Sequence, residues 1–219
     1  MERRQCSSWV SLALLFLGTI SDLSRIDLFS LIDGSALDFQ LLINYLPAYF
    51  PQFTRLRTIM PGVSLGGHTA WRMAALVPDI EAFSMTVGCP NLIALMLSRL
   101  GVDPEKLGTT ANELYKVSYD NLAQVLDDAQ KIRWPRRLHE IASAQDRKIA
   151  EQFPNGPLLL MGGKQDPLVP VKFTVPWVEK RSGNPKVEFF VQDNTGHSCT
   201  KEMVFKLAVW LGNLFAVEK

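Results

Sequence analysis

The sequence predicts an α/β fold in which helices flank a mostly parallel sheet. Short apolar segments with strand character lie at 58–60, 81–87, 157–161 and 186–191, and segments with a helical pattern separate them. Three of the strand segments run into glycine-containing turns that lead to a serine, an aspartate or a histidine. Strands that alternate with helices pair in parallel, and functional side chains gather at their carboxyl ends. The sequence therefore predicts a site at that end of the sheet.

A serine lies in the turn after the first strand segment. The run 62–66 reads Gly-Val-Ser-Leu-Gly and fits G-x-S-x-G, a sharp strand-to-helix turn that exposes a serine hydroxyl. An apolar stretch precedes it and a helical pattern follows at 68–76, although Pro61 is awkward in a central strand. We expect both glycines to be required, because a side chain at either position would collide with the neighbouring strand or helix. The motif predicts that Ser64 is a nucleophile, against the alternative of a plain Gly/Ser loop.

The two later strand segments lead to an acid and a base. Asp166 lies in the turn after 157–161, and His197 lies in a glycine-containing turn after 186–191. Serine, aspartate and histidine occur in this chain order in one group of enzymes that transfer acyl groups through a serine. The sequence thus predicts a triad with Ser64 as nucleophile, His197 as base and Asp166 as the acid that orients the base.

Several side chains near the triad are alternatives to it. Asp193 is a rival acid, but it is only four residues from His197 and is better interpreted as a turn former. Cys199 is a rival thiol nucleophile, but a serine already fills that position, and cysteines of this kind are mostly small core residues. His68 is interpreted as a structural residue, and neither His68 nor His139 has ligand partners at metal spacing. We therefore expect no metal and no cofactor.

The composition fits one globular domain. A chain of 219 residues with 47% apolar residues can bury one sizeable core. We expect a core domain at 26–219, a helical insertion at about 91–153, and a divergent apolar segment at 1–25. A formal net charge of +1 implies no general attraction to nucleic acid. We interpret the basic cluster at 131–137 as a solvated helix face or loop rather than a binding patch.

The compartment and the N-terminus are less defined. Three cysteines are too few for a disulfide framework and fit a reducing compartment. An apolar run at 9–20 follows the charged start Glu2-Arg3-Arg4. Three interpretations of this run remain open: a secretory signal or membrane anchor that gives membrane contact, a buried first helix, and a novel sequence left by an altered gene start. No SKL-type address ends the chain. The oligomeric state is left open.

Helical periodicity assigns buried faces to three further segments. A helix over 26–45, ended by Pro47 and Pro51, is expected to place Leu28, Leu31, Ile32, Leu41, Leu42 and Tyr45 near one face. A last helix over 201–216 is expected to bury Val204, Leu207, Ala208, Leu211 and Phe215. In the insertion, an apolar stripe is formed by Leu92, Leu95, Met96 and Leu100. Such a stripe is more often core than a ligand box, and our hypothesis is that it lines an acyl pocket, so that Met96→Trp would change acyl-chain preference.

The three triad segments resemble the α/β-hydrolase superfamily. From about residue 27 onward the chain resembles more narrowly a fungal group of such hydrolases. The phrases that carry this resemblance are Gly34-Ser35-Ala36-Leu37-Asp38 with Leu46-Pro47-Ala48-Tyr49, then 62–71, and Val87-Gly88-Cys89-Pro90. That group is similar to enzymes of secondary-metabolite pathways, including host-selective toxin pathways of plant pathogens.

The resemblance implies hydrolysis of an ester or related acyl bond of a small molecule. It implies the triad roles given above, an oxyanion-hole N–H from Leu65, a helical lid at 91–153, and a cytoplasmic or peroxisomal location. The family places about four strands before the elbow, and only 63 residues precede Ser64 here, so we expect the first strands to be missing. Two functions follow: an active serine hydrolase, or a catalytically weak remnant that at most binds a ligand or partner.

Overall fold

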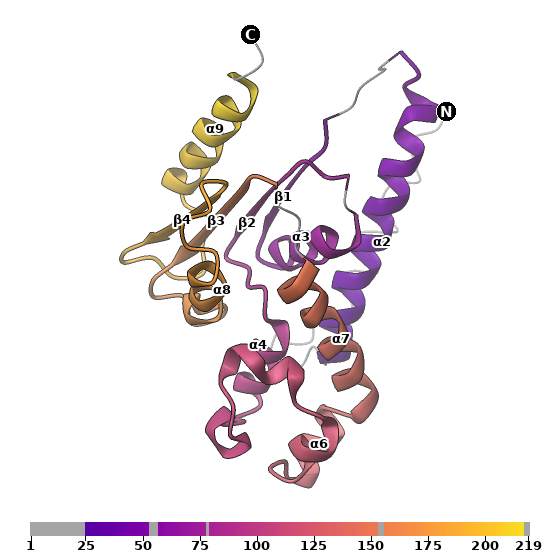
Figure 1. Cartoon of the computed structure of the whole chain (residues 1–219), viewed down its shortest axis with the longest axis vertical. Coiled ribbons are helices and arrows are strands. Elements are labelled where there is room, and N and C mark those ends of the chain that lie inside the picture. Colours follow the sequence, from indigo (N-terminus) through magenta and orange to yellow (C-terminus); the bar gives the residue numbers. More distant parts are fainter. Residues whose placement is uncertain (1–24, 53–56, 78, 153–155, 217–219) are drawn as a thin grey trace, which may run out of the picture.

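Four parallel strands form the sheet at the centre of this chain (Figure 1). The computed structural model describes residues 25–52, 57–77, 79–152 and 156–216. The strands are β1 (Ile59–Val63), β2 (Ala82–Thr86), β3 (Leu158–Gly163) and β4 (Val187–Gln192), and they pair in the order β1-β2-β3-β4. The apolar run at 9–20 lies outside the described residues, so its three interpretations stay open.

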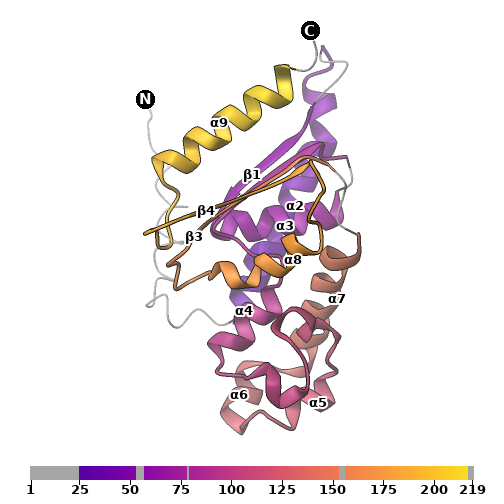
Figure 2. The ribbon, with the colours of Figure 1, turned by 60° about the vertical axis from the view of Figure 1, so that its left-hand side comes forward.

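Helices cover both faces of the sheet, as Figure 2 shows. The long helix α2 (Arg25–Tyr49), the elbow helix α3 (Leu65–Leu76) and α8 (Val175–Glu179), preceded by the short η3 (Val171–Phe173), lie on one side. Among the described helices, only the last one, α9 (Lys201–Ala216), lies on the other side. None of the helices within the four described ranges is long and apolar enough to cross a membrane.

A helical insertion separates β2 from β3 and forms the lower end of the molecule in Figure 1. Its elements are α4 (Leu92–Arg99), η1 (Pro104–Leu107), η2 (Ala111–Lys116), α5 (Tyr119–Ala123), α6 (Asp128–Arg133) and α7 (Arg136–Gln152). Its apolar stripe is buried in a core that it shares with α2 and η3, and Met96 is only 1% exposed. The acyl-pocket hypothesis therefore does not hold for Met96, and a tryptophan there would overpack the core.

Pro61 is compatible with β1 because of its place in the ladder. The Ser64 N–H donates to the Thr86 carbonyl at 2.9 Å. The backbone hydrogen-bonding groups of Ser64, and of every second residue before it, therefore point towards β2. The backbone nitrogen of Pro61 therefore points away from β2, to the side on which no strand of the described sheet pairs with β1. A proline lacks the N–H that an inner ladder needs, so it suits an outer position.

The predicted faces of two helices are wrong in part. In α2 the buried residues are Phe29, Ile32 and Ala36, because this stripe packs towards α3 and the insertion. The expected members Leu31, Leu41, Leu42 and Tyr45 are exposed. The helix also continues through Pro47 to Tyr49, and the Phe50 N–H donates to the Leu46 carbonyl at 2.9 Å.

In α9 the buried side is turned relative to the prediction. Met203 and Trp210 are buried against β2 and β3, because only this stripe reaches the sheet. Val204, Ala208 and Phe215, which were expected to be buried, are exposed.

A partly buried ion pair joins the elbow helix to its neighbours. Arg72 of α3 is 4% exposed, and its Nε donates to Asp33 of α2 at 2.7 Å. Gln145 of α7 accepts a second hydrogen bond from Arg72 and donates Nε2 to Asp33 at 2.7 Å. Since each polar group of this trio has a partner, the trio fixes α3 against α2 and α7.

Candidate active site

Ser64 occupies a strained turn between β1 and α3. Its φ of 55° and ψ of −114° lie where residues with side chains are rarely found. A Cβ at Gly62 would lie 2.0 Å from the Gly66 carbonyl oxygen, so glycine is required at 62. The expectation for Gly66 is wrong, because a Cβ there would meet nothing within 4 Å. Strain of this kind persists where the surrounding structure holds it, and it is common at functional sites.

The close backbone contact that was expected at Gly66 is found instead at Gly67 and Gly88. A Cβ at Gly67 would lie 3.0 Å from the Thr86 carbonyl oxygen, and one at Gly88 would lie 2.9 Å from the Gly67 carbonyl carbon. The helix α3 thus begins directly against the end of β2. The sequence signal was the paired glycine at 66–67 and the glycine that follows β2.

The structure brings Ser64, His197 and Asp166 together at the carboxyl ends of β1, β4 and β3. Ser64 Oγ lies 2.7 Å from His197 Nε2, and His197 Nδ1 lies 2.8 Å from Asp166 Oδ2. Asp166 is 4% exposed, whereas Ser64 and His197 are half-buried. The acid is thus withdrawn from solvent while the hydroxyl and the imidazole edge remain reachable.

Backbone N–H groups hold the second oxygen of Asp166. Its Oδ1 accepts hydrogen bonds from Leu168 at 2.8 Å and from Val169 at 2.9 Å. The Oδ2 atom is therefore left to His197, which favours the imidazole tautomer with its proton on Nδ1 and a free lone pair on Nε2. That lone pair is the one that faces Ser64 Oγ.

Gly163 allows the loop that carries Asp166 (the acid loop) to contact the loop that carries His197 (the histidine loop). A Cβ at Gly163 would lie 2.3 Å from the Gly196 carbonyl oxygen and 2.4 Å from that of Thr195. The Gln165 N–H donates to the Thr195 carbonyl at 2.9 Å, which ties the two loops together. Sequence reasoning missed this role, although a glycine pair at the end of a buried strand was its signal.

The rival residues lie elsewhere. Asp193 is exposed and pairs with Lys164 at 2.7 Å instead of reaching His197. Cys199 is exposed rather than a core residue, which corrects the expectation, and no hydrogen bond joins it to His197 in the described chain. Cys89 is buried, and burial raises the pKa of its thiol above the range in which a thiolate forms. Neither thiol is placed as a nucleophile.

The other two histidines have structural surroundings. His68 Nδ1 faces the Cys89 carbonyl at 3.3 Å, and burial lowers the pKa of His68 to about 4. His139 contacts the Val117 carbonyl through Nε2 at 2.7 Å and accepts the Trp134 indole N–H at 3.2 Å. Within the described ranges, no cluster of three or more His, Cys, Asp or Glu could hold a metal ion.

The basic cluster at 131–137 is largely paired with acids of the insertion. Lys131 lies 3.5 Å from Asp128, and Arg136 lies 2.5 Å from Asp120. Arg137 lies 3.6 Å from Glu140. These exposed pairs agree with a solvated helix face.

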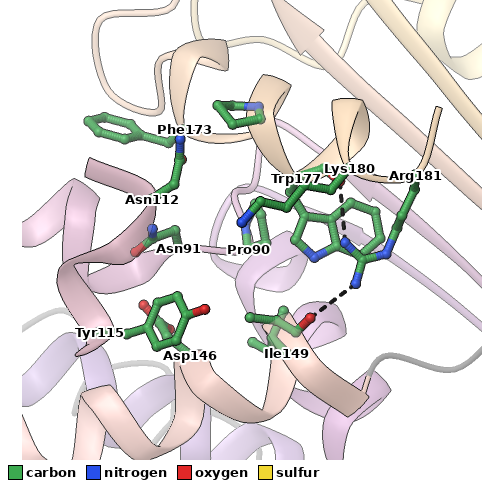
Figure 3. Close-up of a pocket in the computed structure, with 12 residues that line it drawn as sticks. Pro90, Asn91, Asn112, Tyr115, Asp146, Ile149, Phe173, Trp177, Lys180 and Arg181 are labelled. Atoms are coloured by element: carbon green, nitrogen blue, oxygen red, sulfur yellow. Dashed lines mark hydrogen bonds between the residues drawn. The ribbon is translucent and has the colours of Figure 1, made fainter. Parts of the chain in front are cut away.

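A pocket lies between η2, α7 and α8, apart from the triad (Figure 3). It has about 480 Å³ of empty space, part of it open to solvent, and none of the three triad residues lines it. Lys180 and Arg181 face it from the end of α8, and Arg181 stacks on Trp177 at 3.6 Å. Asp146 of α7 lies opposite them.

No model of a known protein family matches this sequence, and no curated protein sequence matches it. Solved structures match its fold. TT1662 from Thermus thermophilus superposes with a TM-score of 0.54 at 17% identity over 83% of this chain and 63% of its own. The acylaminoacyl peptidase of Pyrococcus horikoshii superposes with a TM-score of 0.50 at 14% identity over 81% of this chain and 26% of its own.

An esterase of Pyrococcus furiosus gives a TM-score of 0.49 at 19% identity over 84% of this chain and 61% of its own. This chain therefore spans less than two thirds of each of these three proteins. The parallel sheet, the strained serine turn and the matches at fold level lead to one conclusion: the chain has the α/β-hydrolase fold, with helices on both faces of its sheet and a helical insertion after β2.

Proposed function

We propose that this protein is a serine hydrolase that cleaves an ester or a related acyl bond of a small molecule. The observation that carries the proposal is the chain of two hydrogen bonds, 2.7 Å and 2.8 Å long, that joins Ser64 to His197 and His197 to Asp166. A serine hydroxyl is weakly nucleophilic until a base takes its proton.

Each residue has a distinct role in the proposed reaction. His197 Nε2 takes the proton as Ser64 Oγ attacks the acyl carbon, and then delivers it to the leaving group. Asp166 orients the imidazole and stabilises the imidazolium. Water then attacks the acyl-enzyme, with His197 again as base, and releases the acid. No cofactor takes part in these steps.

The Leu65 N–H is the proposed oxyanion donor. Leu65 begins α3, so its N–H is one of the four that a helix leaves without an internal partner. Loss of one oxyanion donor typically costs about 10²–10³ in turnover. The rate of hydrolysis therefore depends on whether a second N–H donor completes the oxyanion hole. Without one, the alternative function is that of a catalytically weak protein that binds a ligand or partner.

The proposed biological setting rests on the sequence resemblance to fungal hydrolases. That resemblance supports an ester substrate from secondary metabolism, such as a toxin precursor, and a cytoplasmic or peroxisomal location. Ester, thioester and peptide substrates share the same triad chemistry, so a panel of all three is needed to choose among them.

The test is labelling of the purified protein with a fluorescent fluorophosphonate. We expect labelling that Ser64→Ala abolishes and that Ser198→Ala retains, since Ser198 is an exposed serine beside His197. Circular dichroism shows whether each variant is folded. Folded protein that stays unlabelled would overturn the hydrolase proposal and favour the binding function.

A further inference from the structure

Arg99 places a cation beside the catalytic centre. It is the last residue of α4, its side chain is exposed, and its Nη2 donates to the Leu168 carbonyl oxygen at 2.5 Å. Within the described part of the chain this is the only hydrogen bond of its guanidinium, and no carboxylate there forms an ion pair with it. A guanidinium has five N–H donors, so most of this group is available to a ligand.

The contact to Leu168 connects Arg99 to the triad through a continuous set of bonds. The Leu168 N–H donates to Asp166 Oδ1 at 2.8 Å, Asp166 Oδ2 binds His197, and His197 faces Ser64. Both oxygens of Asp166 are thus engaged by other donors.

The charge of Arg99 also acts on groups close to the triad. The charge of Arg99 acts on His68, where it is one of the lesser causes, after burial, of a lowered pKa. Although Arg99 is exposed as a residue, partial loss of water around its guanidinium lowers its pKa, and the charge of Asp166 opposes this shift. A cation that has lost part of its water gains most from an anionic partner.

Two leucines that follow triad residues in the sequence are exposed. Leu65, which follows the nucleophile, is 38% exposed, and Leu168, which follows the acid, is 50% exposed. A substrate that fits these side chains has an aliphatic portion beside the leucines and a negative charge that reaches the guanidinium.

We propose that Arg99 is a specificity-determining residue that selects esters whose acyl portion ends in a carboxylate. The inference rests on the proposed function, and it names the substrate class of that site. Arg99 forms no bond with the reacting atoms. Its fork of N–H groups binds the distal carboxylate in a bidentate manner while Ser64 attacks the ester carbon.

Matched esters test this selection. The mono-p-nitrophenyl esters of adipic and suberic acid have the same chain lengths as p-nitrophenyl hexanoate and octanoate, and differ in the terminal carboxylate. We expect the wild-type protein to show a kcat/KM about tenfold or more higher for the anionic member of at least one pair, since a charge-assisted hydrogen bond contributes on the order of 1.5–3 kcal/mol. Added salt should reduce this preference.

Variants identify the residue responsible. Arg99→Gln should lower kcat/KM for the anionic ester about tenfold or more and leave the neutral ester within about threefold. Arg99→Lys, which keeps the charge without the fork, should be intermediate. The matched control is Arg133→Gln, because Arg133 is likewise an exposed arginine at the end of a helix of the insertion. It should leave both esters unchanged.

The outcomes separate this inference from the proposed function. Equal kcat/KM for the neutral and anionic esters, or an Arg99→Gln variant that slows both alike, overturns the inference and leaves the hydrolase proposal standing. If turnover is too slow to measure, protection from fluorophosphonate by adipate replaces it: protection that Arg99→Gln removes supports the inference, and protection unaffected by the variant overturns it. Absence of labelling in folded wild-type protein overturns both.

Discussion

Gly62 and Gly66 meet across the serine turn, where the Gly66 carbonyl oxygen occupies the space that a Cβ at Gly62 would need. The separation would be 2.0 Å, and the obstacle is backbone that cannot rotate away. The reverse does not hold, because a Cβ at Gly66 meets nothing within 4 Å. Two glycines that look equivalent in the motif therefore have different tolerances.

Substitution at these two positions should separate them. Gly62→Ala should displace the turn and abolish fluorophosphonate labelling of Ser64. Gly66→Ala should keep labelling within about twofold of wild type, because a Cβ there meets nothing within 4 Å and substitutions without a clash change stability by about 0.5 kcal/mol or less. Labelling rates of both folded variants check this, and equal loss in both would contradict the steric argument.

The contact between the acid loop and the histidine loop provides a second pair of glycines to compare, Gly163 and Gly196. Gly163→Ala would place a Cβ 2.3 Å from the Gly196 carbonyl oxygen, so His197 should move relative to Asp166. We expect the labelling rate to fall about a hundredfold, the effect typical of a 1 Å misplacement. Gly196→Ala is the control, since a Cβ there meets nothing within 4 Å. A Gly163→Ala variant that labels normally would show that the loops can adjust.

Asp193 is close to His197 in the sequence and Asp166 is close to it in space, but only Asp166 contacts it. Asp166→Asn should lower kcat for an ester by on the order of 10⁴, because an amide favours the wrong imidazole tautomer. Asp193→Asn should lose one exposed contact to Lys164 and stay within about threefold of wild type. Steady-state hydrolysis by both variants decides the assignment, and loss of activity in Asp193→Asn alone would reverse it.

Asp146 should make stability depend on pH. It is buried in α7, its Oδ2 accepts the Ile93 N–H at 2.8 Å, and burial raises its pKa from 3.8 to about 7. The folded state thus binds a proton that the unfolded state has released. The stability from this group is complete below pH 3.8 and is lost as the pH rises through about 7.

Comparison with an amide measures this contribution. The free energy of unfolding of the wild type, relative to Asp146→Asn, should fall between pH 4 and pH 7 by on the order of a few kcal/mol. The control Asp128→Asn changes a fully exposed aspartate and should keep the pH dependence that Asp146 gives to the wild type. Urea unfolding at several pH values gives both curves. A flat curve for Asp146→Asn would mean that Asp146 is ionised in the folded protein.

The partly buried trio of Arg72, Asp33 and Gln145 should contribute to stability through Asp33. Asp33→Asn removes the charge that faces a guanidinium only 4% exposed, and we expect a loss of about 1–3 kcal/mol in the free energy of unfolding. Asp38→Asn, on the same helix but exposed, should change it by less than about 0.5 kcal/mol. Similar losses in both variants would point to a general effect of charge on α2 rather than to the ion pair.

Much of this protein could be predicted from local sequence alone. The elements β1 to β4, α3 and α9 all lie within a few residues of their predicted positions, because strand length, helical periodicity and glycine or proline boundaries are local properties. Ser64, Asp166 and His197 could be named because each follows a strand, and the carboxyl ends of parallel strands meet.

Tertiary structure alone decided which faces are buried and which glycines are required. The exposed Leu41 and Leu42 of α2, and the exposed Val204 of α9, have the periodicity of a core stripe, but no described element packs against them. A side chain fits at Gly66 but not at Gly163. The atoms that block Gly163 belong to a loop more than thirty residues later in the chain. Arg99 gave no signal in the sequence, since its place beside Asp166 depends on where the insertion folds back onto the acid loop. These are contacts between segments distant in sequence, and a local pattern contains no information about them.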